Sequence, residues 1–226
     1  MTDDPFVLLA GSDEDWPPDA DFVRAAVNAF DPQSPEPLQA LLRSPDEFVS
    51  RRGLNVFAEL GRKGFVVLNA ALALSRHPHD MARNALMDGV ICYPARLDPR
   101  QARTILPLIG DPFSLVREKV VCYLSCADVA TLDAAIGFLD EPLRPAHRAG
   151  LDVLRATHTD AQALFDSALA RRDVPSAYAL ACVERMARRG VLRHEIAYAG
   201  DDRVAEGVAW QVKRFVHRRK NLRLRS

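Results

Sequence analysis

The sequence predicts an all-α protein, a right-handed α-α superhelix (solenoid) of about six stacked helical hairpins. The composition is rich in Ala, Leu, Val and Arg and holds only 7% aromatic residues, which favours helices over strands by intrinsic propensity. Five X-Pro pairs also recur at spacings of 30 to 34 residues, and each opens a segment with helical periodicity. A chain of 226 residues with 48% hydrophobic residues can bury the core that such an array needs.

The five X-Pro pairs indicate where equivalent helices begin. Proline at the first helical position loses no hydrogen bond, and the residue before a proline is pushed out of the helical region. The positions four and eight residues after each proline are small or apolar in all five segments, as one face of an α-helix requires. The pairs are Ser44-Pro45, His77-Pro78, Asp111-Pro112, Glu141-Pro142 and Val174-Pro175.

Shorter apolar-periodic segments alternate with these helices, at 37–42, 65–74, 100–109, 130–139, 161–169 and 192–198. Two helices in each repeat describe a stack in which every hairpin buries its apolar face only against its neighbours. Asp201 or Asp202 is expected to cap a helix of a sixth hairpin that continues through Phe215. The repeat array is therefore predicted over residues 36–217.

The two ends of the chain differ from the repeats in charge. Residues 1–50 hold eleven acidic and two basic residues, whereas the segment from Gln211 onward holds seven basic residues and no acid. Residues 1–35 are predicted to form an acidic irregular cap with a helix from Asp19 to Phe30, because a terminal repeat needs a polar outer face. A basic C-terminal tail is predicted over residues 218–226. The basic run, which could contact nucleic acid, an acidic membrane surface or an acidic partner, includes Lys213, Arg214, Arg218, Arg219 and Lys220.

Cysteine usage and motif content limit the chemistry. Cys92, Cys122, Cys126 and Cys182 lie in apolar stretches, and no apolar run reaches the roughly 20 residues of a membrane span. We therefore predict a reduced, cytoplasmic protein without a membrane span. The sequence contains no glycine-rich phosphate loop, Gly-x-Ser-x-Gly, His-Glu-x-x-His or Cys-x-x-Cys motif, so we predict no catalytic, cofactor-binding or metal site.

Two of the proline-led segments carry a shared motif. In the segment Asp111-Pro-Phe-Ser-Leu-Val-Arg117, a turn Asp is followed by a Val-Arg pair, and His77-Pro-His-Asp-Met-Ala-Arg83 keeps the Arg with His in place of Asp. This motif resembles the second helix of HEAT-like repeats, in their short bacterial form. His147 and Leu180 stand where the Arg belongs in the fourth and fifth segments. In the resembled family the Arg commonly pairs with the turn Asp of a neighbouring repeat, which implies a structural ladder of Arg83, Asp111 and Arg117.

A further row of positions, six and ten residues after each proline, falls beside the apolar face. In a solenoid the second helices build a continuous concave surface, so this row is the predicted binding surface, here called the ridge. Its charges have both signs, whereas a nucleic-acid groove would carry Arg and Lys at most positions. The mixture favours a protein partner. The ridge consists of Arg51, Asn55, Asn84, Asp88, Glu118, Arg148, Asp152 and Arg185.

The sequence thus predicts a non-enzymatic, protein-binding scaffold that acts through its concave face. Bacterial HEAT-like proteins of this size often serve as adaptors or as immunity proteins that neutralise a toxin, and the resemblance implies a function of that kind. Two alternatives remain, and the oligomeric state stays open. An alkylpurine DNA glycosylase is also a solenoid of about six such repeats, but it would need tryptophans near a carboxylate, and Trp16 and Trp210 lie near opposite ends. A phycobilin lyase-like protein would hold a tetrapyrrole or its acceptor protein.

Overall fold

A computed structural model describes residues 4–11, 20–171 and 173–188, and all regular secondary structure in this part of the chain is helical. The predicted all-α class is confirmed. The chain divides into two compact units, Met1–Arg96 and Leu97–Ser226, each of which is considered by itself. Trp16, the sixth hairpin, Trp210 and the whole basic tail from Lys213 lie outside the described residues.

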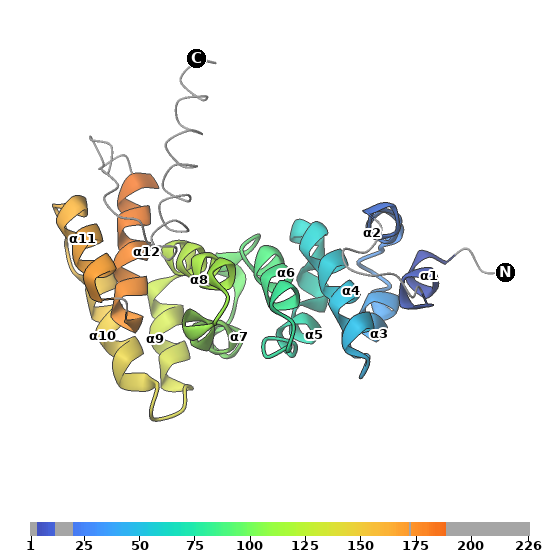
Figure 1. Cartoon of the computed structure of the whole chain (residues 1–226), viewed down its shortest axis with the longest axis horizontal. Coiled ribbons are helices and arrows are strands. Elements are labelled where there is room, and N and C mark those ends of the chain that lie inside the picture. The colour runs from blue at the N-terminus through green and yellow to red at the C-terminus, as the bar shows by residue number, and fades with distance from the viewer. Residues whose placement is uncertain (1–3, 12–19, 172, 189–226) are drawn as a thin grey trace, which may run out of the picture. The chain divides into compact units, whose positions relative to one another are not determined.

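Unit 1 consists of an N-terminal helical pair and two hairpins. The predicted helix from Asp19 to Phe30 is present as α2, whereas α1 was not predicted. The second helices of the two hairpins, α4 and α6, lie side by side (Figure 1). The elements are α1 (Pro5–Gly11), α2 (Ala20–Ala29), α3 (Glu36–Leu42), α4 (Glu47–Glu59), the 3-10 helix η1 (Gly61–Val67), α5 (Leu68–Leu72), α6 (Asp80–Val90) and the 3-10 helix η2 (Pro94–Arg96).

Close packing in unit 1 depends on a small residue facing an aromatic ring. A Cβ atom on Gly89 of α6 would lie 2.2 Å from Cε1 of Phe57 on α4, so only glycine lets the two helices approach this closely. The ring of Phe57 also meets Tyr93 edge to face, at 6.3 Å between centroids. Tyr93 in turn packs against Phe65, whose face is covered by the guanidinium of Arg96.

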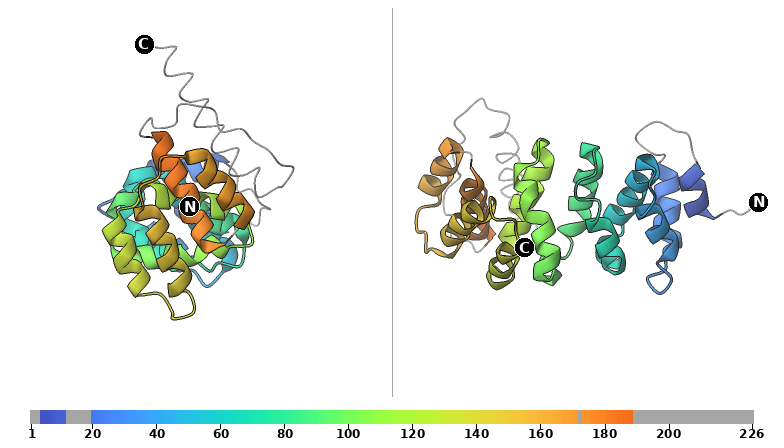
Figure 2. Two further views of the ribbon diagram at one scale, coloured as in Figure 1. Left: turned by 90° about the vertical axis from the view of Figure 1, so that its left-hand side faces the viewer. Right: turned by 90° about the horizontal axis from the view of Figure 1, so that it is seen from below.

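Unit 2 contains three further hairpins, so all five predicted second helices are confirmed. The residues eight positions after each proline, from Gly53 to Val183, are buried in every case, as the apolar pattern predicted. Figure 2 shows the last hairpin, in which α11 and α12 pack together. The elements are α7 (Pro99–Ile105), the 3-10 helix η3 (Leu106–Gly110), α8 (Ser114–Cys126), α9 (Val129–Gly137), α10 (Arg144–Arg155), α11 (Ala161–Arg171) and α12 (Val174–Arg188).

The prolines do not occupy the position that the sequence suggested. Pro45, Pro78, Pro112 and Pro142 each precede the first helical residue by two positions, and only Pro175 lies inside the first turn of its helix. The residue between proline and helix is the N-cap, which has an extended backbone at Asp46, His79 and Phe113. A helix start needs an N-cap residue ahead of its first helical residue, so these four prolines lie two positions before the predicted one.

The residue before the proline accepts the same kind of hydrogen bond in the first three hairpins. Its side chain accepts a hydrogen bond from the backbone N–H two residues later, at 3.2 Å for Ser44 Oγ, 3.1 Å for His77 Nδ1 and 2.8 Å for Asp111 Oδ1. Because a hydroxyl, an imidazole and a carboxylate all offer an acceptor at this place, the His in the second repeat preserves the function of the Asp in the third.

Arg83 and Arg117 close these turns from the helix side. Nη1 of Arg83 donates to the carbonyls of His77 and Pro78, at 2.7 and 2.9 Å, and Nη1 of Arg117 donates in the same way to Asp111 and Pro112. The guanidinium therefore satisfies carbonyls that the turn leaves without a helical partner. Equivalent side chains make equivalent bonds in two repeats.

The last hairpin contacts more than its sequence neighbour. The helix α12 packs against both α10 and α8, and in Figure 1 it stands between them. Arg185 of α12 donates from Nε to the carbonyl of Ser125 at 3.0 Å and from Nη2 to those of Leu124 and Ala127 at 2.8 and 2.6 Å. The expectation that each hairpin packs only against its neighbours is therefore wrong here, because the fifth hairpin completes the C-terminus of a helix in the third.

His147, where the HEAT-like pattern has Arg, packs against α12 instead of closing a turn. Its Nδ1 lies 3.0 Å from the Tyr178 hydroxyl, and the two rings meet edge to face. Burial lowers the pKa of His147 to about 4, so the imidazole is neutral at pH 7. Gly150 leaves room for this ring, since a Cβ there would lie 2.3 Å from Cδ2 of Tyr178.

Replacement of Arg185 by Met tests its role at the end of α8. Arg185→Met keeps the apolar stem and removes donors to three carbonyls, so we expect the free energy of unfolding to fall by about 2–4 kcal/mol in urea titrations. The control Arg171→Met removes a largely exposed guanidinium and should change it by less than about 0.5 kcal/mol. Equal effects of both variants would contradict the assignment.

Replacement of Gly150 by Ala tests the close approach of α10 and α12. The new methyl group meets the ring of Tyr178, and we expect a loss of about 1–3 kcal/mol in the free energy of unfolding. Gly137→Ala is the matched control, because nothing lies within 4 Å of its Cβ position at the end of α9. That variant should leave stability unchanged or raise it by up to about 1 kcal/mol.

Candidate binding surface

The ridge in unit 1 is more buried than its polar sequence suggests. Only 6% of Arg51 and 8% of Asn84 is exposed, while Asn55 and Asp88 are half-buried. The cause is the side-by-side packing of α4 and α6, which covers the positions next to the apolar face as well as the face itself. These four residues thus lie within and beside a helix-helix contact, and they do not form an open row of solvated side chains.

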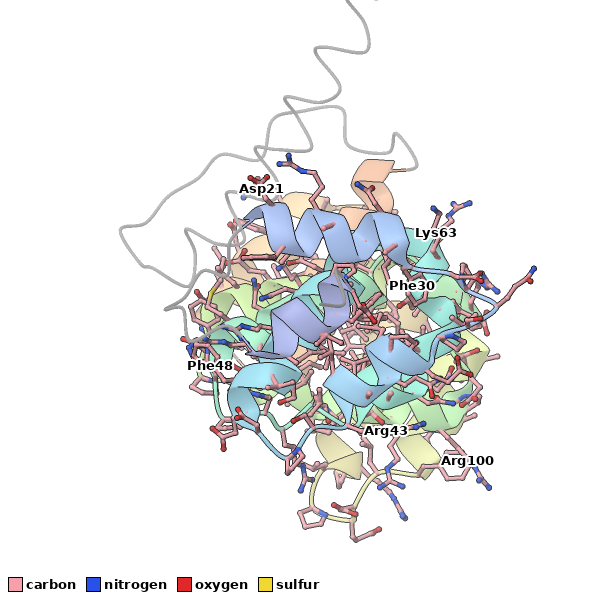
Figure 3. All side chains as sticks on the ribbon, turned by 90° about the vertical axis from the view of Figure 1, so that its right-hand side faces the viewer. Asp21, Phe30, Arg43, Phe48, Lys63 and Arg100 are labelled. Atoms are coloured by element: carbon pink, nitrogen blue, oxygen red, sulfur yellow. The ribbon has the colours of Figure 1, made fainter. Side chains whose placement is uncertain are left out.

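Arg51 is held in place by an aromatic ring. The guanidiniums of Arg51 and its neighbour Arg52 lie 4.4 and 4.5 Å from the centroid of the Phe48 ring. Phe48 lies near the edge of unit 1, in the first turn of α4 (Figure 3). Burial lowers the pKa of Arg51, and the positive charge of Arg52 lowers it further. Arg51 is therefore a packed side chain, and its contact with the Phe48 ring was not predicted.

Asn55 carries an unsatisfied donor. Its Nδ2 atom is sealed from solvent, and the described residues offer it no hydrogen-bond acceptor. An amide nitrogen in this state costs about 1–3 kcal/mol compared with one that is hydrogen-bonded. Because this nitrogen is sealed, a partner cannot reach it, and the missing hydrogen bond is a cost of the packing around α4.

In unit 2 the ridge residues have three different environments. Arg148 and Asp152 of α10 are exposed, and Arg148 pairs with Asp133 on α9, as does Arg155. Both arginines lower the pKa of Asp133, mainly through the hydrogen bond from Arg155. Arg185 is half-buried and its guanidinium is held by the carbonyls at the end of α8. Arg148 and Arg185 thus have structural contacts of their own.

Glu118 on α8 is the ridge residue with the most unusual surroundings. Only 7% of it is exposed, and none of the described residues donates a hydrogen bond to its carboxylate or forms an ion pair with it. Burial raises the pKa of Glu118, although the charges of Lys119 and Arg117 lower it to a smaller extent. Its oxygens are not sealed from solvent, unlike Nδ2 of Asn55. The carboxylate is therefore desolvated, without a partner, and still reachable.

The other chemistry-bearing residues have structural contacts. His77, which is buried, places Nε2 at 3.1 Å from the carbonyl of Glu47, and burial lowers its pKa. Cys92, Cys122 and Cys126 are half-buried and Cys182 is buried. No group of three or more His, Cys, Asp and Glu side chains in the described residues is placed to hold a metal ion. Within the same residues, no helix is long and apolar enough to cross a membrane.

Comparisons were made with protein-family models, with curated proteins and with solved structures, and none of the three gave a match.

Replacement of Glu118 by Gln tests the cost of its burial through pH dependence. Because the pKa is raised in the folded chain, the folded state holds the proton more tightly than the unfolded state does. Stability from this group is therefore full below about pH 4.3, the usual pKa of glutamate, and is lost as the pH rises through the folded value. We expect Glu118→Gln to gain stability relative to the parent between pH 4 and pH 7 in urea titrations.

The control for this comparison is Glu141→Gln, whose carboxylate is 82% exposed and pairs with Arg144. It should show no relative gain over the same pH range. A Glu118→Gln variant whose stability relative to the parent falls with rising pH would contradict the environment described for Glu118.

Proposed function

We propose that this chain is a non-enzymatic, protein-binding scaffold of the HEAT-like repeat type, a right-handed α-α superhelix with an altered last hairpin. Five consecutive helical hairpins support the proposal, as do the equivalent Arg-closed turns in the second and third of them. Its partner is another protein, bound as an adaptor or a toxin-neutralising immunity protein binds its target. We place the protein in the cytoplasm.

The observation that carries the proposal is an unsatisfied but reachable carboxylate on the ridge. The carboxylate of Glu118 in unit 2 has no donor among the described residues, and its oxygens are not sealed from solvent, whereas Nδ2 of Asn55 in unit 1 is sealed. Most buried polar groups in folded proteins are hydrogen-bonded. Glu118 occurs at a ridge position, six residues after its proline, where a partner would meet a second helix.

Affinity capture of the full-length chain from its native source, followed by mass spectrometry and reconstitution, tests this function. We expect one protein partner that rebinds the purified chain at about 1:1 stoichiometry in calorimetry. Glu118→Gln should weaken that binding by about tenfold, since it removes a negative charge that only the complex neutralises.

Two controls make the experiment decisive. Glu141→Gln and Asp166→Asn alter exposed carboxylates away from the ridge and should leave the affinity unchanged. A chain that rebinds no purified protein partner contradicts the scaffold function. A partner that binds Glu118→Gln as tightly as the parent contradicts the assignment of the ridge.

A further inference from the structure

Three residues on one face of α8 form a stripe that combines apolar surface with a carboxylate. Leu115, Glu118 and Cys122 are spaced at i, i+3 and i+7, so they lie in line along the helix. Leu115 is a large apolar side chain with 38% of its surface exposed, and Cys122 is half-buried. Between them lies the Glu118 carboxylate, with which no described residue forms a hydrogen bond or an ion pair. The stripe thus offers apolar surface beside a single desolvated negative charge.

This combination has a specific chemical complement. A buried carboxylate is best neutralised by a cation that loses little hydration free energy when it leaves water. A guanidinium meets this condition because it is more weakly hydrated than an ammonium group. A guanidinium also donates two parallel hydrogen bonds to a carboxylate. The methylene stem of an arginine is apolar and packs along exposed apolar surface such as that of Leu115.

None of the cations near Glu118 in the described structure forms an ion pair with its carboxylate, Lys119 included. The Arg117 guanidinium donates to the carbonyls of Asp111 and Pro112, and the Arg185 guanidinium donates to the C-terminus of α8. Both lie on elements that pack in unit 2, yet neither forms an ion pair with Glu118. The carboxylate is thus not paired with any cation of the described residues, and it is open to a cation from another molecule.

We propose that the Leu115–Glu118–Cys122 stripe receives an arginine side chain of the partner protein, with the guanidinium on the Glu118 carboxylate and the stem on Leu115. The inference rests on the proposed function and adds the chemistry of the partner's contact residue. The partner therefore presents a basic segment with an arginine next to apolar residues, and its acidic counterpart on this chain is one buried carboxylate.

A capped peptide, Ac-Leu-Arg-Leu-NH2, and its lysine and citrulline counterparts are the probes. Full-length chain labelled with 13C and 15N is titrated by NMR, and the Glu118 carboxyl signal is assigned by its loss in Glu118→Gln. We expect the arginine peptide to shift the amides of residues 115, 118 and 122 and to lower the pKa of Glu118. The lysine and citrulline peptides should bind about tenfold more weakly or not at all.

Matched variants separate the stripe from general attraction. Glu118→Gln should abolish binding of the arginine peptide, and Leu115→Ala should weaken it several-fold. Glu141→Gln and Leu143→Ala should leave the binding unchanged. Leu143 is a matched control because its exposed fraction, 37%, is similar to that of Leu115. Equal binding of the citrulline peptide, or binding that survives Glu118→Gln, would overturn the proposal.

A second experiment addresses the chain's own basic residues as the source of the cation. Lys213, Arg214, Arg218, Arg219 and Lys220 are changed together to Gln in the full-length chain. We expect the pKa of Glu118 to stay the same without peptide. A rise in that pKa would show that the tail occupies the stripe, which overturns the proposal of an external arginine. A partner that binds at 1:1 independently of Glu118 would leave the scaffold function standing and refute the stripe alone.

Discussion

The described helices depend on turns that satisfy the polar groups at helix starts. A helix begins with backbone N–H groups that have no intrahelical acceptor, and each proline removes one more donor that could have bridged the turn. In the first three hairpins a side chain before the proline accepts the N–H of the N-cap residue. In the second and third, an arginine from the helix also covers the carbonyls. This local closure fixes where each second helix starts, and the register of its buried face follows.

Where the turn chemistry changes, the packing changes too. The fourth hairpin has His147 at the arginine position, and its imidazole contacts Tyr178 of α12 in place of its own turn. The N-cap residue of α10 is Leu143, which provides no side-chain acceptor. Arg185 joins α12 to α8, because its guanidinium donates three hydrogen bonds to backbone carbonyls at the C-terminal end of α8. In the C-terminal hairpins of unit 2, these long-range bonds add to local ones, which Arg144 makes to the Leu139 carbonyl and Ser176 makes to Asp173.

The fold class and the helix order could be predicted because they depend on local signals. Proline spacing, apolar periodicity and small residues at fixed positions are all visible in the sequence, and Gly53, Leu86 and Val120 are buried as the pattern required. The contact of α12 with α8 could not be predicted. Arg185 lies ten residues after its proline, and this spacing alone predicts a position on the ridge. The burial of Arg51 and Glu118 was missed for a related reason, since a helix period gives the direction of a side chain and not what covers it.

Glu118 shows how a stability cost can indicate a binding function. Selection for stability alone would favour Gln or an apolar residue at a site where burial raises the pKa of a carboxylate and no donor compensates it. A glutamate at such a site is explained if the charge is neutralised in a complex. The desolvation cost of the carboxylate in the isolated chain is then offset on binding, but only by a partner that brings a suitably placed cation. The same residue therefore contributes specificity as well as affinity, because a partner without that cation leaves the charge buried and unpaired.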